Sequence, residues 1–67
     1  MISNYEFREK IFVFINKTGM SATRFGTKSM KDPSFVFRLV KGREVRERGK
    51  LRVLSFMENY EKGEKNA

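Results

Sequence analysis

One short segment of the 67-residue chain places a hydroxyl, an aromatic ring and two basic groups on one side of a predicted helix. The segment is MKDPSFVFRLVKG, residues 30–42. At about 100° per residue, the shared face comprises Ser34, Phe37, Arg38 and Lys41. Positive charge beside hydrogen-bonding and aromatic groups suits contact with a polyanion, so this face is the first candidate for a binding site.

The ends of this helix are indicated by residue type. Asp32 suits the N-cap position, and Pro33 suits the first helical residue, where its missing N–H costs nothing. Gly42 suits the position after the last turn, and Lys41 complements the helix dipole there. A helix over residues 33–41 is therefore predicted.

The other side of the same helix is apolar. We take Val36 as the centre of the buried stripe, with Leu39 and Val40 beside it. Phe35 lies at the margin, from which its ring can turn into the core. One face is thus expected to hold the fold, while the opposite face is turned to a ligand.

Three further helices are predicted over residues 4–17, 22–30 and 47–61, because apolar residues recur at helical spacing and alternating runs are absent. Gly19 is expected to end the first of them, and Ser21 to cap the second. Their expected buried positions are Phe7, Ile11, Phe14, Ile15, Ala22, Phe25, Gly26, Ser29, Val53, Leu54, Met57 and Tyr60, with Phe56 bordering the last set and Leu51 near its start.

The pattern predicts one all-α domain, a compact bundle of four to five helices over residues 1–61. A disordered tail is expected over residues 62–67, since short polar ends of this composition are rarely ordered.

The net charge of +7 is confined to the middle of the chain. Residues 22–52 hold ten basic and three acidic residues, whereas the two flanks are nearly balanced. Charge that served only solubility would be scattered, so its confinement favours a polyanion partner.

Several classes of protein are disfavoured by composition. Cysteine and histidine are absent, and the carboxylates are dispersed among basic residues. We therefore expect a non-enzymatic protein without a metal, a cofactor or a small-molecule ligand. No apolar run approaches the roughly 20 residues that would span a bilayer, and the N-terminus lacks the pattern of a signal peptide. The expected location is the cytoplasm, with no membrane partner.

Two short helices over residues 22–30 and 33–41, joined by a tight turn, make a helix-turn-helix pattern. Such motifs place the N-terminal part of the second helix in the major groove of DNA. The exposed face of residues 33–41 would then be the DNA-facing one.

These residues also resemble a known family. The stretch GMSATRFGTKSMKDPSFVFRLVKGR, continued by LRVLSFM, is similar to the lambda-repressor-like, Xre-type helix-turn-helix regulators, and closest to a short single-domain form of alphaproteobacteria and their prophages. The likeness covers about residues 17–57. Phe25 and Gly26 occupy the large and small positions of the motif's first helix, and Val36 and Leu39 the aliphatic positions of its second.

The turn departs from the family pattern, because Met30 stands where a glycine is usual. A different backbone path, set by Asp32 and Pro33, is therefore expected.

The resemblance implies control of transcription at the bacterial nucleoid, through sequence-specific binding to double-stranded DNA by one copy or by a homodimer. It implies that base edges are contacted by Ser34, Phe37 and Arg38. It implies that the DNA backbone is contacted by Thr23, Arg24, Lys28, Lys41, Arg43, Arg46, Arg48 and Lys50.

A second class of function stays open at this point. A protein-interaction module, such as an antitoxin, an antirepressor or an adaptor, can use the same scaffold. Its contact patch would be formed by Tyr5, Phe12 and Phe37. Arg46, Arg48 and Lys50 are interleaved with Glu44 and Glu47, so a salt-bridged surface is an alternative to phosphate contact for these three residues.

Overall fold

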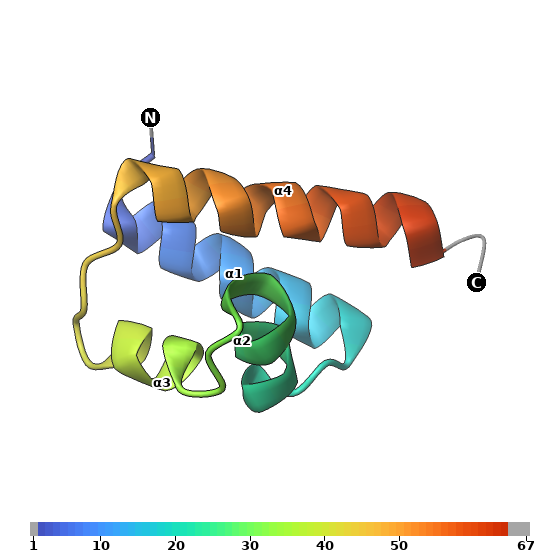
Figure 1. The fold of residues 1–67 in the computed structure, drawn as a ribbon, viewed down its shortest axis with the longest axis horizontal. Helices are drawn as coiled ribbons and strands as arrows, with labels where there is room; N and C mark the ends of the chain where they lie inside the picture. The colour runs from blue at the N-terminus through green and yellow to red at the C-terminus, as the bar shows by residue number, and fades with distance from the viewer. Residues whose placement is uncertain (1, 65–67) are drawn as a thin grey trace.

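The computed structural model describes residues 2–64, which form four α-helices and no strand (Figure 1). The all-α prediction is confirmed for these residues. The helices are α1 (Asn4–Thr18), α2 (Ala22–Met30), α3 (Phe35–Val40) and α4 (Glu47–Glu64). The predicted bounds hold for α2 and are one residue short for α1, while α3 and α4 differ more.

The first connection is built as its residue types predict. Gly19 takes a left-handed backbone with φ of 74° and ends α1, and its N–H donates to the carbonyl of Ile15 at 2.9 Å. Ser21 then caps α2, its hydroxyl accepting the N–H of Arg24 at 3.1 Å. Both local predictions are confirmed, because each depends on only a few neighbouring residues.

α1 and α4 lie along each other and run in the same direction (Figure 1). Two long-range contacts hold their matching ends. Near the start of both helices, the ammonium of Lys50 donates to the carbonyl of Ile2 at 2.9 Å. Near their ends, Lys17 and Glu61 form an ion pair at 3.0 Å. The connection between the two helices, which contains α2 and α3, covers one side of the pair.

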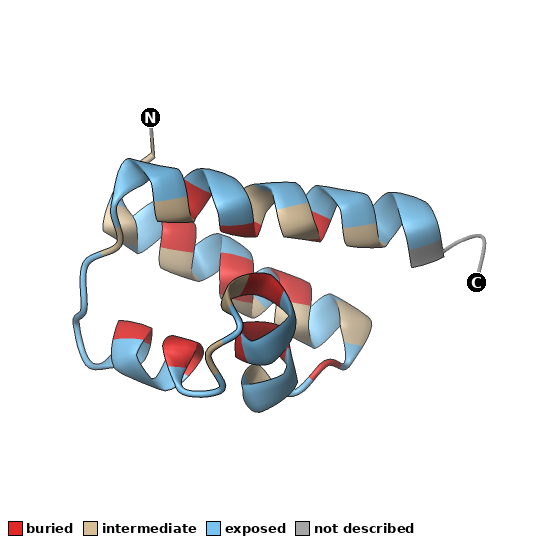
Figure 2. Cartoon of the chain, viewed as in Figure 1, coloured by how far each residue is buried: buried red, intermediate tan, exposed pale blue. Residues whose placement is uncertain are grey.

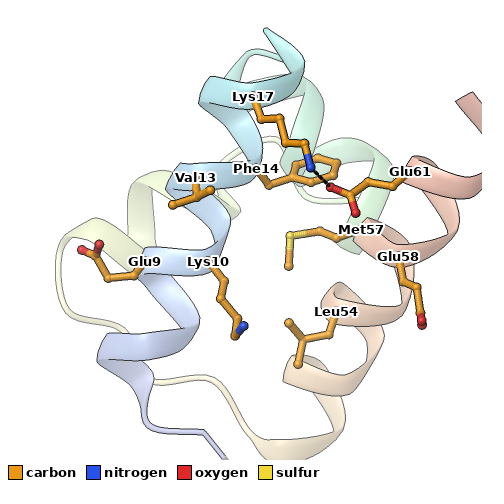
Figure 3. Close-up of a pocket in the computed structure, with 9 residues that line it drawn as sticks. All are labelled: Glu9, Lys10, Val13, Phe14, Lys17, Leu54, Met57, Glu58 and Glu61. Atoms are coloured by element: carbon orange, nitrogen blue, oxygen red, sulfur yellow. Dashed lines mark hydrogen bonds and ion pairs between the residues drawn. The ribbon is translucent and has the colours of Figure 1, made fainter.

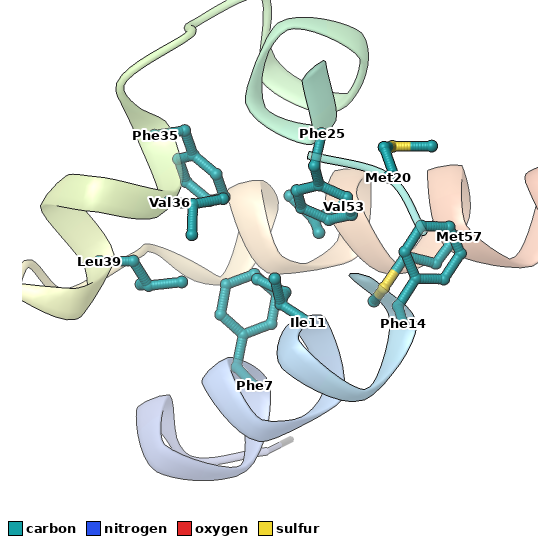
Figure 4. Packing of buried hydrophobic residues seen from close by; sticks show 10 residues of the cluster. All are labelled: Phe7, Ile11, Phe14, Met20, Phe25, Phe35, Val36, Leu39, Val53 and Met57. Atoms are coloured by element: carbon teal, nitrogen blue, oxygen red, sulfur yellow. The ribbon is translucent and has the colours of Figure 1, made fainter. Parts of the chain in front are cut away.

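The core is a cluster of aromatic and aliphatic side chains drawn from all four helices (Figures 2 and 4). Phe14 is central to it, since its ring meets those of Phe25 and Tyr60 at 5.5 Å and that of Phe56 at 6.1 Å, all edge to face. Such pairs add stability beyond area burial. The buried hydrophobic residues are Phe7, Ile11, Phe14, Met20, Phe25, Phe35, Val36, Leu39, Val53 and Met57.

The turn from α2 to α3 rests directly on α2. Lys31 takes the left-handed conformation, with φ of 55°, and Asp32 donates its N–H to the carbonyl of Gly26 at 3.1 Å. A Cβ at Gly26 would overlap the carbonyl oxygen of Asp32 and lie 3.2 Å from the Cβ of Phe35. The close approach of the turn therefore requires a glycine at this position. The left-handed residue of the turn is Lys31, which directly follows Met30 and precedes Asp32 and Pro33, the two residues that were expected to set the path.

The start of α3 differs from the prediction. Asp32 and Pro33 were expected as N-cap and first helical residue, but α3 begins at Phe35. The N–H of Phe35 donates to the carbonyl of Asp32 at 3.0 Å, which closes a tight turn before the helix. The Asp32 carboxylate accepts the N–H of Ser34 at 3.0 Å. Asp32 therefore caps the turn that precedes α3, and does not cap α3 itself.

The prediction that Val40 lies in the core is wrong, because 56% of this residue is exposed. Phe35, Val36 and Leu39 are the buried residues of α3. The stripe is therefore centred on Leu39, not on Val36, and the helix is rotated so that the Phe35 ring points inward. Burial of a phenyl ring removes more apolar area from water than burial of a valine, which favours this rotation.

α4 extends to Glu64, three residues beyond the predicted end at Glu61. Residues 62–64 are thus helical and do not belong to a disordered tail, while residues 65–67 lie outside the described part of the chain. Leu51, near the predicted buried set, is exposed, and Lys50 takes the inward place.

We expect Gly26→Ala to destabilise the domain by about 1–3 kcal/mol, since its methyl group overlaps the backbone of the turn. Urea unfolding followed by circular dichroism measures this loss. The matched control is Gly63→Ala in α4, where an added Cβ meets nothing. The control should keep its stability or gain up to about 1 kcal/mol from helix propensity. Equal midpoints for the two variants would contradict the close approach at Gly26.

Candidate nucleic-acid interface

The candidate interface is the outer side of α2, the turn and α3. In Figure 2 the side of α3 turned away from α1 and α4 is exposed along its length. Phe37 is 52% exposed, and Ser34 and Arg38 are also exposed. The three predicted base-contacting residues therefore share one accessible side of the chain. Val40 joins this side through the rotation of α3 and adds a second apolar group to it.

Arg38 is held by a carboxylate that sequence reasoning assigned only to capping. One guanidinium nitrogen of Arg38 lies 3.1 Å from Oδ2 of Asp32, while Oδ1 accepts the N–H of Ser34. The Arg38 side chain is 53% exposed, so the pair is worth at most about 1 kcal/mol and can rearrange. The carboxylate thus orients the guanidinium but leaves further N–H donors for a ligand.

The predicted backbone-contacting residues lie on three neighbouring segments. Those on α2 and at the end of α3 are exposed, as are Arg43 and Arg46 of the loop before α4 and Arg48 in the first turn of α4. Within residues 2–64 no ion pair involves Arg46, Arg48 or Lys50, so the salt-bridged alternative for these residues is not borne out. The exposed set is Thr23, Arg24, Lys28, Lys41, Arg43, Arg46 and Arg48.

Lys50 is a correction to the predicted set. It is only 8% exposed, and its ammonium donates to the carbonyl of Ile2 at 2.9 Å. Its aliphatic stem lies under the start of α1 while its charged end reaches a backbone acceptor, the usual compromise for a buried lysine. Lys50 therefore joins α1 to α4 and is removed from the interface. Its position three residues before Val53 and seven before Met57 places it on the buried stripe, a signal in the sequence that was not used.

A groove of about 640 Å³ runs between α1 and α4, with α2 and α3 behind it in the view of Figure 3. Its floor contains Phe14, Leu54 and Met57, and exposed Val13 lies at its rim. The Lys17–Glu61 ion pair crosses one end. This surface is separate from the outer side of α3, so the molecule has two distinct faces available for contacts.

Other kinds of site find no support in residues 2–64. No group of three or more acidic, cysteine or histidine side chains is placed to hold a metal ion there. None of the four helices is long and apolar enough to cross a membrane. No family model, curated protein or solved structure matches this chain.

We expect Lys50→Ala to lower the unfolding free energy by about 1–3 kcal/mol, because it removes a buried stem and a charged hydrogen bond to Ile2. Lys50→Met keeps the stem and should lose less. The matched control, Arg48→Ala, removes the same charge from an exposed site and should change stability by no more than about 0.5 kcal/mol. Thermal melts of the three variants measure this order, and an undisturbed Lys50→Ala melt would refute the buried role.

Proposed function

We propose that this protein is a sequence-specific regulator of transcription that binds double-stranded DNA. In this proposal α2, the turn and α3 act as a helix-turn-helix of the lambda-repressor-like, Xre type, and α3 enters the major groove. The family assignment carries with it a bacterial cytoplasmic setting at the nucleoid. It also assigns no catalytic role to the chain.

One observation carries the proposal. Two short helices, of nine and six residues, are joined by residues 31–34. The outer side of the second helix and its N-cap carry the ring of Phe37, the guanidinium of Arg38 and the hydroxyl of Ser34. The length of that connection is the length typical of helix-turn-helix units. The surrounding exposed residues are basic, which suits a duplex whose backbone carries one negative charge per phosphate.

The side chains of this face divide into two roles. Arg38 can donate two hydrogen bonds to O6 and N7 of a guanine, and its orientation by Asp32 reduces the freedom it loses on binding. Phe37 and Val40 offer apolar contact to a thymine methyl group. The surrounding lysines and arginines supply attraction to phosphates without selecting a base.

Selection of bound sequences from a pool of random duplexes tests the function directly. A recovered motif supports a sequence-specific regulator. Binding of all duplexes without a motif would contradict sequence-specific regulation, and absence of binding would refute the proposal altogether.

Arg38 and Lys41 should differ in the kind of effect that their loss has. Arg38→Ala is expected to cost about 1–3 kcal/mol on the selected site and to relax the preference at one base position. Lys41 follows the end of α3 and should meet phosphate, so Lys41→Ala should weaken all sequences alike and lower the salt slope by roughly one ion. Fluorescence anisotropy with specific and random duplexes over a salt series separates the two.

Lys10→Ala serves as the control, because Lys10 is exposed on α1 at the groove of Figure 3 and lies outside the proposed interface. It should change neither specificity nor salt slope. If Arg38→Ala and Lys41→Ala lose affinity equally on both duplexes, α3 binds DNA without selecting bases.

A second function, a protein-interaction module, is favoured by the apolar groove between α1 and α4. Two of the three rings predicted for its contact patch, Tyr5 and Phe37, are exposed, while Phe12 packs partly against the core. Val13→Glu separates the two functions. It should leave affinity for the selected duplex unchanged if the protein acts through α3, and should abolish partner capture if it acts through the groove.

Two copies on one operator are the expected state, because a single small module makes few phosphate contacts. Analytical ultracentrifugation of the protein with the selected duplex measures this stoichiometry, and one copy at saturation would refute it.

A further inference from the structure

A second pocket, of about 450 Å³, lies between the turn after α2 and the loop before α4. Four arginines line it: Arg43, Arg46, Arg48 and Arg52. Arg43 and Arg46 come from the loop and Arg48 from the first turn of α4, and these three belong to the predicted DNA-contacting set. Arg52 comes from α4, has no role in the DNA-binding proposal, and is brought to the same cavity by the fold.

The charge around this pocket is not balanced by the protein. Within residues 2–64 none of the four arginines forms an ion pair. Two acidic residues, Asp32 and Glu44, also line the cavity, but Asp32 is already bound to Arg38 at 3.1 Å. Guanidinium groups that surround one small volume repel each other unless an anion lies between them. Their planar forks also match the oxygen geometry of phosphate.

The apolar part of the pocket lining, here called its floor, includes Met30 and Val45, which are partly exposed, while Phe35 borders the pocket but is only 3% exposed. Gly49 is in close contact with this floor, since a Cβ there would lie 2.7 Å from Cγ1 of Val45 and 3.7 Å from the terminal carbon of Met30. A DNA phosphate that crosses the arginine rim would make no use of such a floor. The organic part of a small molecule would rest on it, because ligand pockets typically combine apolar walls with a few polar groups.

We propose that this arginine pocket binds a phosphate group carried by a small organic molecule, whose apolar or planar part lies on Met30 and Val45. This proposal departs from the sequence-based expectation of no small-molecule ligand, because the arginines and the floor come from separate segments of the chain that only the fold brings together. The proposal does not depend on DNA binding. If both hold, ligand and operator share three arginines, so occupancy of the pocket weakens the attraction of the loop to DNA.

Adenosine monophosphate is a suitable probe, because it joins a phosphate to a planar body. Titration at fixed ionic strength, followed by amide signals in nuclear magnetic resonance, should shift the amides of Val45 and Gly49 to saturation. Inorganic phosphate should bind several-fold more weakly, and adenosine should give no saturable shift. Equal affinity for adenosine monophosphate and inorganic phosphate would refute the role of the floor.

Arg52→Ala should weaken the binding of adenosine monophosphate about tenfold, because one charge-assisted contact is lost. Lys10→Ala removes the same charge elsewhere and should leave the affinity unchanged. Circular dichroism establishes that both variants are folded, which is expected because both residues are exposed. Unchanged binding by Arg52→Ala, or equal losses in both variants, would overturn the proposal.

A duplex titration identifies the source of the phosphate. If the amides of Val45 and Gly49 respond to DNA but not to adenosine monophosphate, the pocket receives the DNA backbone and the small-molecule proposal is wrong. The nucleotide titration contains no DNA, so its outcome stands whether or not the protein proves to be a regulator.

Discussion

The position of α3 depends on one backbone contact, in which the turn after α2 lies directly on Gly26. The carbonyl of Asp32 occupies the space that a Cβ would need, and its N–H donates to the carbonyl of Gly26 at 3.1 Å. This approach aims the first turn of α3 at the core, so that Phe35 and Leu39 are buried. The same residue, Asp32, holds Arg38 on the outer side. Packing on one side of the turn and orientation of a binding group on the other are therefore set together.

The chain has no cysteine to form a disulfide, and residues 2–64 contain no group of side chains placed to hold a metal ion, so packing is what the described core offers for stability. Its centre is a set of rings in edge-to-face contact, with Phe14 from α1, Phe25 from α2, and Phe56 and Tyr60 from α4. Because the rings come from three helices, loss of one removes contacts between several elements at once. The α2–turn–α3 unit therefore packs on the α1–α4 pair through aromatic side chains. Each such side chain buries a large apolar area, so a small domain needs few of them.

The basic middle of the chain is divided by the fold into groups with different tasks. Lys50 joins α4 to the start of α1 and is buried, so its charge does not face the solvent. Arg38 is oriented on the outer side of α3. Arg43 and Arg46 of the loop and Arg48 and Arg52 of α4 form no ion pair within residues 2–64, and all four line one cavity. In sequence these residues belong to one stretch of positive charge, and the proposed division of labour arises from which of them meet an acceptor inside the protein.

The sequence by itself determined the local features, namely the all-α class, the bounds of α2, the left-handed end at Gly19 and most of the buried stripe on α1. Each of these depends on neighbours a few residues apart, through periodicity and caps. Tertiary structure decided the rotation of α3, which exposes Val40, and the burial of Lys50 against a carbonyl 48 residues away. It also assembled the arginine pocket from α2, the turn after it, α3, the loop before α4 and α4 itself. Such features depend on how the helices pack in three dimensions. The sequence pattern indicates which face of a helix is apolar, but it does not specify which residues that face will contact.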